Sequence, residues 1–186
     1  MAMLALAGCA TVRHSAVRSD YDAMDRDKTL RLVVVTAPLP DANPAVGELW
    51  SLIARRYVNQ HRDFIVHRQL AATEPPANAC REGTQGVLLL RPRLRRHDGD
   101  VDAAVDAKLT RCPGGEKIWE AQAAGTWPKS DATVKELTAR YVEELGPDVR
   151  SYVPATFHLL RATLDTLPHP RLVRDEDVME KVDLGE

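Results

Sequence analysis

The stretch Gly86–Trp127 constrains the fold most, because it specifies how three successive strands pair. Asp98-Gly99 is a strong two-residue hairpin signal, and taking it as the loop pairs His97 with Asp100. The apolar face of this hairpin then matches Leu94 with Ala103, Pro92 with Val105, Leu90 with Ala107, and Leu88 with Leu109. A slip of one residue would place apolar side chains opposite charges, so the sequence determines the register.

The opposite face of the hairpin pairs Arg95 with Asp102 and Arg91 with Asp106. Such cross-strand charge pairs stabilise a sheet by a few tenths of a kcal/mol to about 1 kcal/mol each. Pro113-Gly114-Gly115 then forms a loop to a third strand. Its register places Leu109 beside Trp119, Ala107 beside Ala121, Val105 beside Ala123, Ala103 beside Gly125, and Lys108 beside Glu120. The buried face is rich in small residues, so helices must supply bulk: Trp50, Leu137, Tyr141, Phe157 and Leu160 are the candidates.

The remaining elements follow from local signals. The β-rich run Leu30–Thr36 predicts a first strand, and Asn43-Pro44 starts a helix that ends near His61. A short strand over Phe64–Leu70 and a loop over 71–85 precede the meander. Two helices follow it: one capped by Ser130 and ended by Gly146-Pro147, the other with Pro154 in its first turn and Leu167 near its end. The order β-α-β-β-β-β-α-α predicts an α+β fold, with a mixed or antiparallel sheet and helices packed on one face.

The N-terminal residues Leu6-Ala7-Gly8-Cys9 indicate where the chain resides. They resemble a bacterial lipobox, and the chain is similar to a family of uncharacterised envelope lipoproteins that carry one small α+β domain. The resemblance implies that Cys9 carries a lipid, and that Ala10 directs the product to the outer membrane, facing the periplasm. Met1–Gly8 is too short and lacks the basic residues of a signal peptide, so we expect the gene to begin upstream.

These observations divide the chain into four parts. We expect a residual signal peptide over 1–8, the lipidated cysteine and a polar tether over 9–28, the α+β domain over 29–170, and a charged C-terminal tail over 171–186 that could dock as a short element. A chain of 186 residues with 44% hydrophobic and 28% charged residues fits one folded domain. The formal net charge of −2 argues against a nucleic-acid partner.

The chain has three cysteines, which leaves Cys80 and Cys112 as a possible pair once Cys9 is assigned to the lipid. In the register above, Cys112 lies opposite Gln85, next to the loop that holds Cys80. We expect a disulfide if the chain is exported; two unrelated buried thiols are the alternative. The absence of a Cys-x-x-Cys motif argues against a redox role.

The run Arg91, Arg93, Arg95 and Arg96 is the most prominent charge feature. It could bind phosphates, acidic lipid headgroups or an acidic partner, with Arg91, Arg93 and Arg95 as the contact residues. A solvated face whose arginines pair with aspartates is the alternative. Arg93 lies opposite Ala104 and is expected to be unpaired, which makes it the first candidate contact.

No pattern in the sequence supports an enzyme, a cofactor or a metal site. The six histidines are scattered, and nucleotide-binding and serine-hydrolase motifs are absent. The first hypothesis is a non-enzymatic periplasmic accessory or adaptor protein that binds another envelope protein. In build it is similar to small domains of auxiliary lipoproteins in envelope transport and peptidoglycan-synthase activation. The alternative is a domain that binds a small ligand or lipid, or less readily a hydrolase, with a site between sheet and helices; the 71–85 loop could cover that site.

Overall fold

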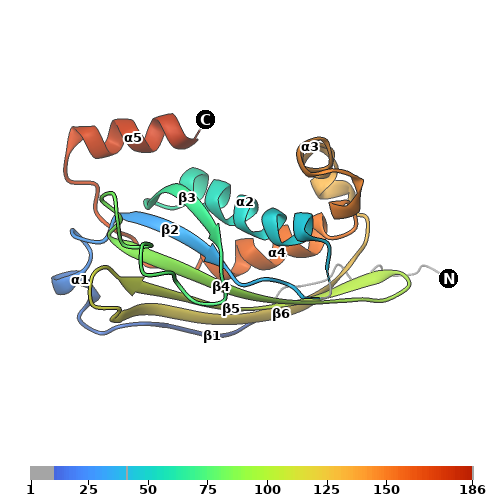
Figure 1. Ribbon diagram of the computed structural model, residues 1–186, viewed down its shortest axis with the longest axis horizontal. Helices are drawn as coiled ribbons and strands as arrows, with labels where there is room; N and C mark the ends of the chain where they lie inside the picture. Colours follow the sequence, from blue (N-terminus) through green and yellow to red (C-terminus); the bar gives the residue numbers. More distant parts are fainter. Residues whose placement is uncertain (1–10, 41, 186) are drawn as a thin grey trace.

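The computed structural model describes residues 11–40 and 42–185. Its centre is a six-stranded mixed sheet in the order β1-β6-β5-β4-β2-β3. The strands are β1 Thr11–Val17, β2 Arg31–Thr36, β3 Ile65–Ala71, β4 Gly86–Arg96, β5 Asp100–Arg111 and β6 Lys117–Pro128. The helices are α1 Tyr21–Met24, α2 Pro44–His61, α3 Lys135–Leu145, α4 Val153–Leu164 and α5 Asp175–Gly185, with 3₁₀ turns at Ala132–Val134 and Pro147–Val149. Helices α2 to α5 lie on one side of the sheet (Figure 1).

The predicted α+β fold with helices on one face is confirmed, and so is the register of the meander. Every cross-strand partner predicted for β4, β5 and β6 is observed. The pairing departs from a regular ladder only after Leu109, where a shift makes Thr110 the partner of Lys117. β2 pairs in parallel with both β3 and β4, which makes the sheet mixed.

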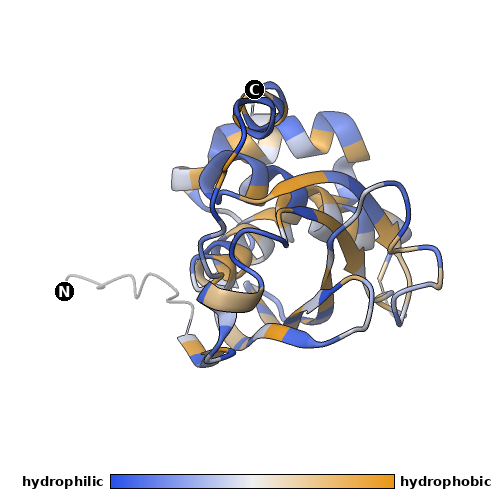
Figure 2. Cartoon of the chain, turned by 90° about the vertical axis from the view of Figure 1, so that its left-hand side faces the viewer, coloured by the Kyte–Doolittle hydropathy of each residue, from blue (hydrophilic) through white to orange (hydrophobic). Residues whose placement is uncertain are grey.

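The core fills the space between the sheet and helices α2 and α4. Trp50, Trp119 and Trp127 are its largest fully buried side chains. Helix α2 begins as predicted, because the Asn43 side chain accepts a hydrogen bond from the backbone N–H of Ala45 at 3.0 Å. The turn before α3 differs from the prediction: Asp131, rather than Ser130, caps it by accepting from the Thr133 N–H at 2.8 Å. Figure 2 shows hydrophobic residues, coloured orange, along the strands of the sheet.

Gly125 on β6 is required by the indole ring of Trp127, two residues further along the same face of the strand. A Cβ atom at position 125 would lie 2.4 Å from the Cη2 atom of Trp127. Trp127 is only 2% exposed, so its ring has little room to move. The ring therefore fills the space that the missing side chain leaves.

Replacing Gly125 with valine should lower the free energy of unfolding by about 1–3 kcal/mol, because the buried indole must leave its packed position. Urea unfolding measures the loss. Gly47→Ala is the control, because nothing lies within 4 Å of a Cβ built at Gly47, and the change should not destabilise α2. In a Trp127→Leu background the valine should cost much less; equal costs in both backgrounds would contradict the explanation.

Part of the N-terminal stretch predicted to be a tether is folded. Thr11–Val17 forms the edge strand β1, antiparallel to β6, and Tyr21–Met24 forms the short helix α1. The tether expectation is wrong for these residues because backbone pairing with β6 orders a segment that buries almost no side chains. Cys9, the predicted lipidation site, lies outside the described residues.

A buried carboxylate fixes the segment that follows β1. Asp25 is fully buried, and its Oδ1 lies 3.4 Å from the Nη1 of Arg111 at the end of β5. Its Oδ2 lies 3.5 Å from the Nη1 of Arg18. The hydroxyl of Thr29 also donates to Oδ1 at 3.5 Å. This ion cluster joins residues 18–29 to the meander, and Tyr21 adds a buried apolar contact to the main core.

The loop over residues 72–85 covers the face of the sheet opposite the helices. It packs Ala79 against a second, smaller apolar cluster formed by Val33, Val35, Val87 and Leu89. The predicted disulfide is present: Cys80 and Cys112 are bonded, with their Cα atoms 5.5 Å apart. The loop is therefore stapled to the outer face. It therefore does not cover the interface between sheet and helices, where the alternative hypothesis places a ligand site.

The described part of the chain contains no helix long and apolar enough to span a membrane. The same residues contain no group of three histidine, cysteine, aspartate or glutamate side chains placed to hold a metal ion.

Candidate interaction surface

The uncovered part of the outer sheet face carries a hollow of about 620 Å³. Its floor follows from the register: Thr11 pairs with Ala124, Ala124 with Ala104, and Ala104 with Arg93, so the four residues form one row across four strands. The two alanines are small, whereas longer side chains stand around them. The result is a shallow depression with an alanine floor.

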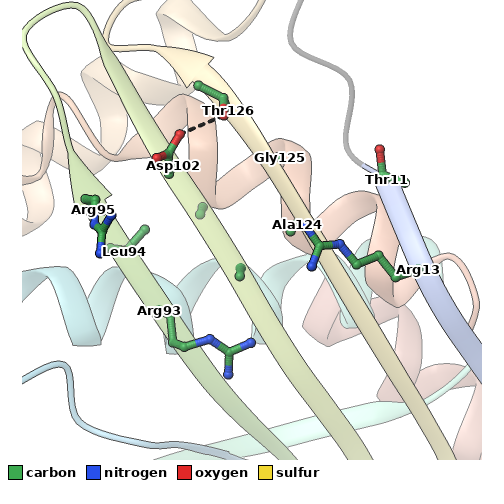
Figure 3. A pocket seen from close by; sticks show the side chains of 11 residues that line it. Thr11, Arg13, Arg93, Leu94, Arg95, Asp102, Ala124, Gly125 and Thr126 are labelled. Atoms are coloured by element: carbon green, nitrogen blue, oxygen red, sulfur yellow. Dashed lines mark hydrogen bonds between the residues drawn. The ribbon is translucent and has the colours of Figure 1, made fainter.

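Three arginines wall this hollow: Arg13 from β1, and Arg93 and Arg95 from β4. Figure 3 shows Arg13 reaching from β1 across β6 while Arg93 extends from β4 over β5, so that the two side chains approach one another across the floor. We call the depression bounded by Arg13, Arg93 and Arg95 the arginine hollow. The sequence singled out Arg93 and Arg95 but missed Arg13, whose place depends on the irregular pairing between Val12 and His14.

The ion pairs on this face differ from those that the register predicts. Arg93 pairs diagonally with Asp106, and Arg91 pairs with Glu74 from the 72–85 loop. The expectation that Arg93 is unpaired is therefore wrong. Arg95, predicted to pair with Asp102, forms no ion pair with any described residue, and neither does Arg13. A long arginine side chain can reach a diagonal neighbour as well as the residue directly opposite, which explains why Arg93 pairs with Asp106.

Asp102 is held by other groups. The Thr126 hydroxyl donates to its Oδ1 at 2.7 Å, and the His97 Nε2 lies 2.7 Å from its Oδ2. The hydrogen bond from Thr126, followed by that with His97, keeps the pKa of Asp102 below its usual value. Because this carboxylate is already engaged, the guanidinium of Arg95 keeps its hydrogen-bond donors for another acceptor.

A second notable surface is helix α5, which contacts α2 and β3 and is held there by charged side chains. Arg31 on β2 pairs with Asp177 at 2.7 Å and with Glu180. Lys181 Nζ donates to the carbonyl oxygens of Phe64 at 2.6 Å and Val58 at 2.9 Å. This side chain therefore satisfies carbonyl groups near the end of α2.

The outward side of α5 exposes several apolar side chains. Val178, Met179 and Val182 are 42%, 61% and 52% exposed, and Val173 just before the helix is also exposed. Asp177, Glu180 and Lys181 thus face the body of the protein, whereas these apolar side chains face solvent among the exposed charges of Asp175, Glu176 and Asp183. An ordinary surface helix buries its apolar side chains instead. Helix α5 lies at the periphery of the molecule (Figure 2).

The contacts that hold α5 in place shift the pKa values of two of its side chains. The hydrogen bond from Arg174, with that from Arg31, lowers the pKa of Asp177 to about 2. Burial lowers the pKa of Lys181 to about 8. Asp177 is therefore stabilised as the carboxylate that holds α5 in place.

Acidification should release α5. The pKa of Asp177 is lower in the folded state than its usual 3.8, so its contribution is present above that value and is lost as pH falls toward 2. NMR should show the α5 amide signals moving to unfolded positions between about pH 4 and 2. In Asp177→Asn this pH dependence should shrink to the part that Glu180 contributes through Arg31, with α5 already loosened at neutral pH. If the α5 signals change only together with those of the core, the explanation fails.

A third feature is a crevice of about 540 Å³ at the carboxyl ends of the parallel strands β2 and β3, beside the start of α2. Ser51 donates to the Thr36 hydroxyl at 2.8 Å in its wall. The Oε1 of Gln69, which also lines it, has no hydrogen-bond partner among the described residues. Crevices at this edge of a parallel sheet are common ligand sites.

Comparison with known proteins identifies the fold but no family. No protein-family model matches the sequence, and no curated protein does. A solved structure of the PelC dodecamer from Paraburkholderia phytofirmans covers 88% of this chain and 99% of its own, with a TM-score of 0.52 and 18% identity. The two chains share a fold.

Two more distant structures were also found. A hypothetical protein from Chlamydia trachomatis covers 73% of this chain and 94% of its own, at 12% identity and a TM-score of 0.46. A DUF330 protein from Xanthomonas campestris covers 77% of this chain and 89% of its own, at 12% identity and a TM-score of 0.34. At these identities the likeness to PelC establishes architecture alone, and the two lower scores add nothing to it.

Proposed function

We propose that this protein is a non-enzymatic accessory protein of the bacterial envelope. It is anchored to the outer membrane by a lipid on Cys9, faces the periplasm, and binds another envelope protein through helix α5. The observation that carries the proposal is the exposure of Val178, Met179 and Val182 on α5, a helix that is held to the body of the protein by charged side chains such as Asp177. Burying such side chains against a partner would be favourable by roughly 25 cal/mol per Å² of apolar surface.

Two observations support the envelope location. The segment Leu6-Ala7-Gly8-Cys9 resembles a lipobox. The Cys80–Cys112 disulfide suits an oxidising compartment such as the periplasm. Both are independent of the surface of α5, so the anchor and the partner can be tested separately.

The anchor is tested by mass spectrometry of the N-terminus, with the gene expressed from its upstream start beside a Cys9→Ala variant. We expect an acylated cysteine in the first protein and none in the variant. An unmodified Met1 in the soluble fraction would contradict the envelope assignment.

The partner is tested by placing a photo-crosslinking amino acid at Met179 in intact cells, with the exposed Glu136 on α3 as the control position. We expect an adduct with a different envelope protein from position 179 only. PelC forms a dodecamer, so a second copy of this chain is the other occupant to consider. An adduct of twice the monomer mass would assign self-assembly in place of an adaptor role, and no adduct would overturn the proposal.

A second candidate function is the binding of a small ligand in the crevice beside α2. The observation that favours it is the amide oxygen of Gln69, which has no hydrogen-bond partner among the described residues and belongs to a residue that lines the crevice. Native mass spectrometry of the purified protein tests it: a bound small molecule that is lost in Gly47→Leu would support this function, because Gly47 lines the crevice. A ligand-free mass would argue against it.

A further inference from the structure

We propose that the arginine hollow binds phosphate groups of anionic lipids in the membrane that holds the lipid of Cys9. The inference rests on the proposed function, because that lipid supplies the membrane. It assigns a role to the bare face of the sheet, whereas the protein partner is assigned to α5 on the other side.

The first support is that two arginines of the hollow have no ion-pair partner among the described residues. Arg13 and Arg95 form no ion pair with any described residue, although the nearby carboxylates of Asp102 and Asp106 are both engaged. Asp106 pairs with Arg93, and Asp102 with Thr126 and His97. A guanidinium presents several N–H donors in a planar fork that matches the oxygens of a phosphate. Two such forks are therefore available at one depression.

The second support is the shape of the site. The alanine pair Ala104 and Ala124 forms a floor between the arginine walls, so a headgroup of modest size can approach the guanidinium groups from the open side. The hydroxyl of Thr11 stands at the end of the same row. A flat or convex sheet surface would offer the charges without the depression.

The third support is position relative to the anchor, and it selects lipid over free phosphate. Thr11 lines the hollow, and Cys9 precedes it by two residues. Whatever path the chain takes, two residues span at most about 7 Å. An acylated Cys9 therefore holds the rim of the hollow at the membrane surface, where lipid phosphates are concentrated.

The test measures the binding of the full chain, carrying Cys9→Ala so that no acyl group contributes, to vesicles in a flotation assay. The vesicles contain phosphatidylethanolamine with phosphatidylglycerol, or phosphatidylcholine alone. We expect binding to the anionic vesicles only. The variant Arg13→Gln/Arg95→Gln should bind about 25-fold more weakly, at roughly fivefold for each basic residue near an anionic surface.

The matched control is Arg140→Gln/Arg150→Gln, which removes the same charge from exposed arginines on the helical side. It should bind like the parent protein. Equal loss in both double variants, or no loss in the first, would overturn the site. If the protein binds both kinds of vesicle equally and millimolar inorganic phosphate releases it from them, the hollow recognises free phosphate. That result would also overturn the proposal. Because the assay uses unacylated protein, its result does not depend on whether Cys9 is modified or α5 has a partner.

Discussion

Replacing Trp119 with alanine is expected to lower the free energy of unfolding by about 3–5 kcal/mol, the usual range for removing a buried tryptophan. Trp119 on β6 is fully buried and lies between Leu109 on β5 and Val17 on β1. Its indole N–H donates to the Thr166 hydroxyl, just after α4, at 3.2 Å. One side chain thus joins the sheet, its edge strand and the covering helix.

Urea unfolding monitored by far-ultraviolet circular dichroism measures this loss. Trp119→Phe keeps most of the ring volume and removes the hydrogen bond, so it should cost clearly less than alanine. If alanine cost under 1 kcal/mol, Trp119 would not be a central contact of the core. If phenylalanine cost as much as alanine, the hydrogen bond to Thr166 would outweigh the packing.

Reduction of the Cys80–Cys112 disulfide is expected to destabilise the protein by about 3–4 kcal/mol. The bond joins residues 32 positions apart. Closing a loop of this length lowers the conformational entropy of the unfolded chain, which raises the free energy of the unfolded state by roughly 3–4 kcal/mol. It also fixes the 72–85 loop over the apolar cluster of Val33, Val35, Val87 and Leu89. Urea midpoints with and without reductant, in a Cys9→Ala background, measure the effect.

The variant Cys80→Ala/Cys112→Ala is the control for this experiment. Its urea midpoint should be low in both conditions and insensitive to reductant. An unchanged midpoint of the parent protein on reduction would show that the bond does not contribute to stability. Limited proteolysis should also cut the reduced protein first within residues 72–85, because the loop loses its staple.

The meander could be predicted residue by residue because several independent signals agree there. Asp98-Gly99 fixes the turn, and alternating apolar and charged residues on both faces penalise every shifted register. Strand β1 lacks such signals. In Thr11–Val17 only Val12 has a partly buried apolar side chain, because the strand lies at the edge of the sheet and is held by its backbone. Edge pairing of this kind leaves little trace in composition.

The candidate site was predicted in part for a similar reason. A register fixes which residues are neighbours, so Arg93 and Arg95 could be placed together on one face. It does not fix which carboxylate a flexible arginine contacts, and the diagonal pair of Arg93 with Asp106 became visible only with side-chain positions. Arg13 depends on an irregularity in a strand that the sequence did not predict. The polar docking side of α5 likewise depends on Arg31, far away in the chain.

Helix α5 is held to the body by ion pairs and exposes apolar side chains to solvent, so ionic strength acts on these two sets of contacts in opposite directions. The contact of Glu180 with Arg31 is electrostatic and partly accessible to solvent, so added salt screens it, whereas the buried Asp177 is screened less. Apolar contacts through Met179 and Val182 are not weakened in this way, and salts such as sulfate strengthen them. A salt-rich medium should therefore loosen α5 from the body of the protein while it strengthens the apolar contact that we propose for this helix.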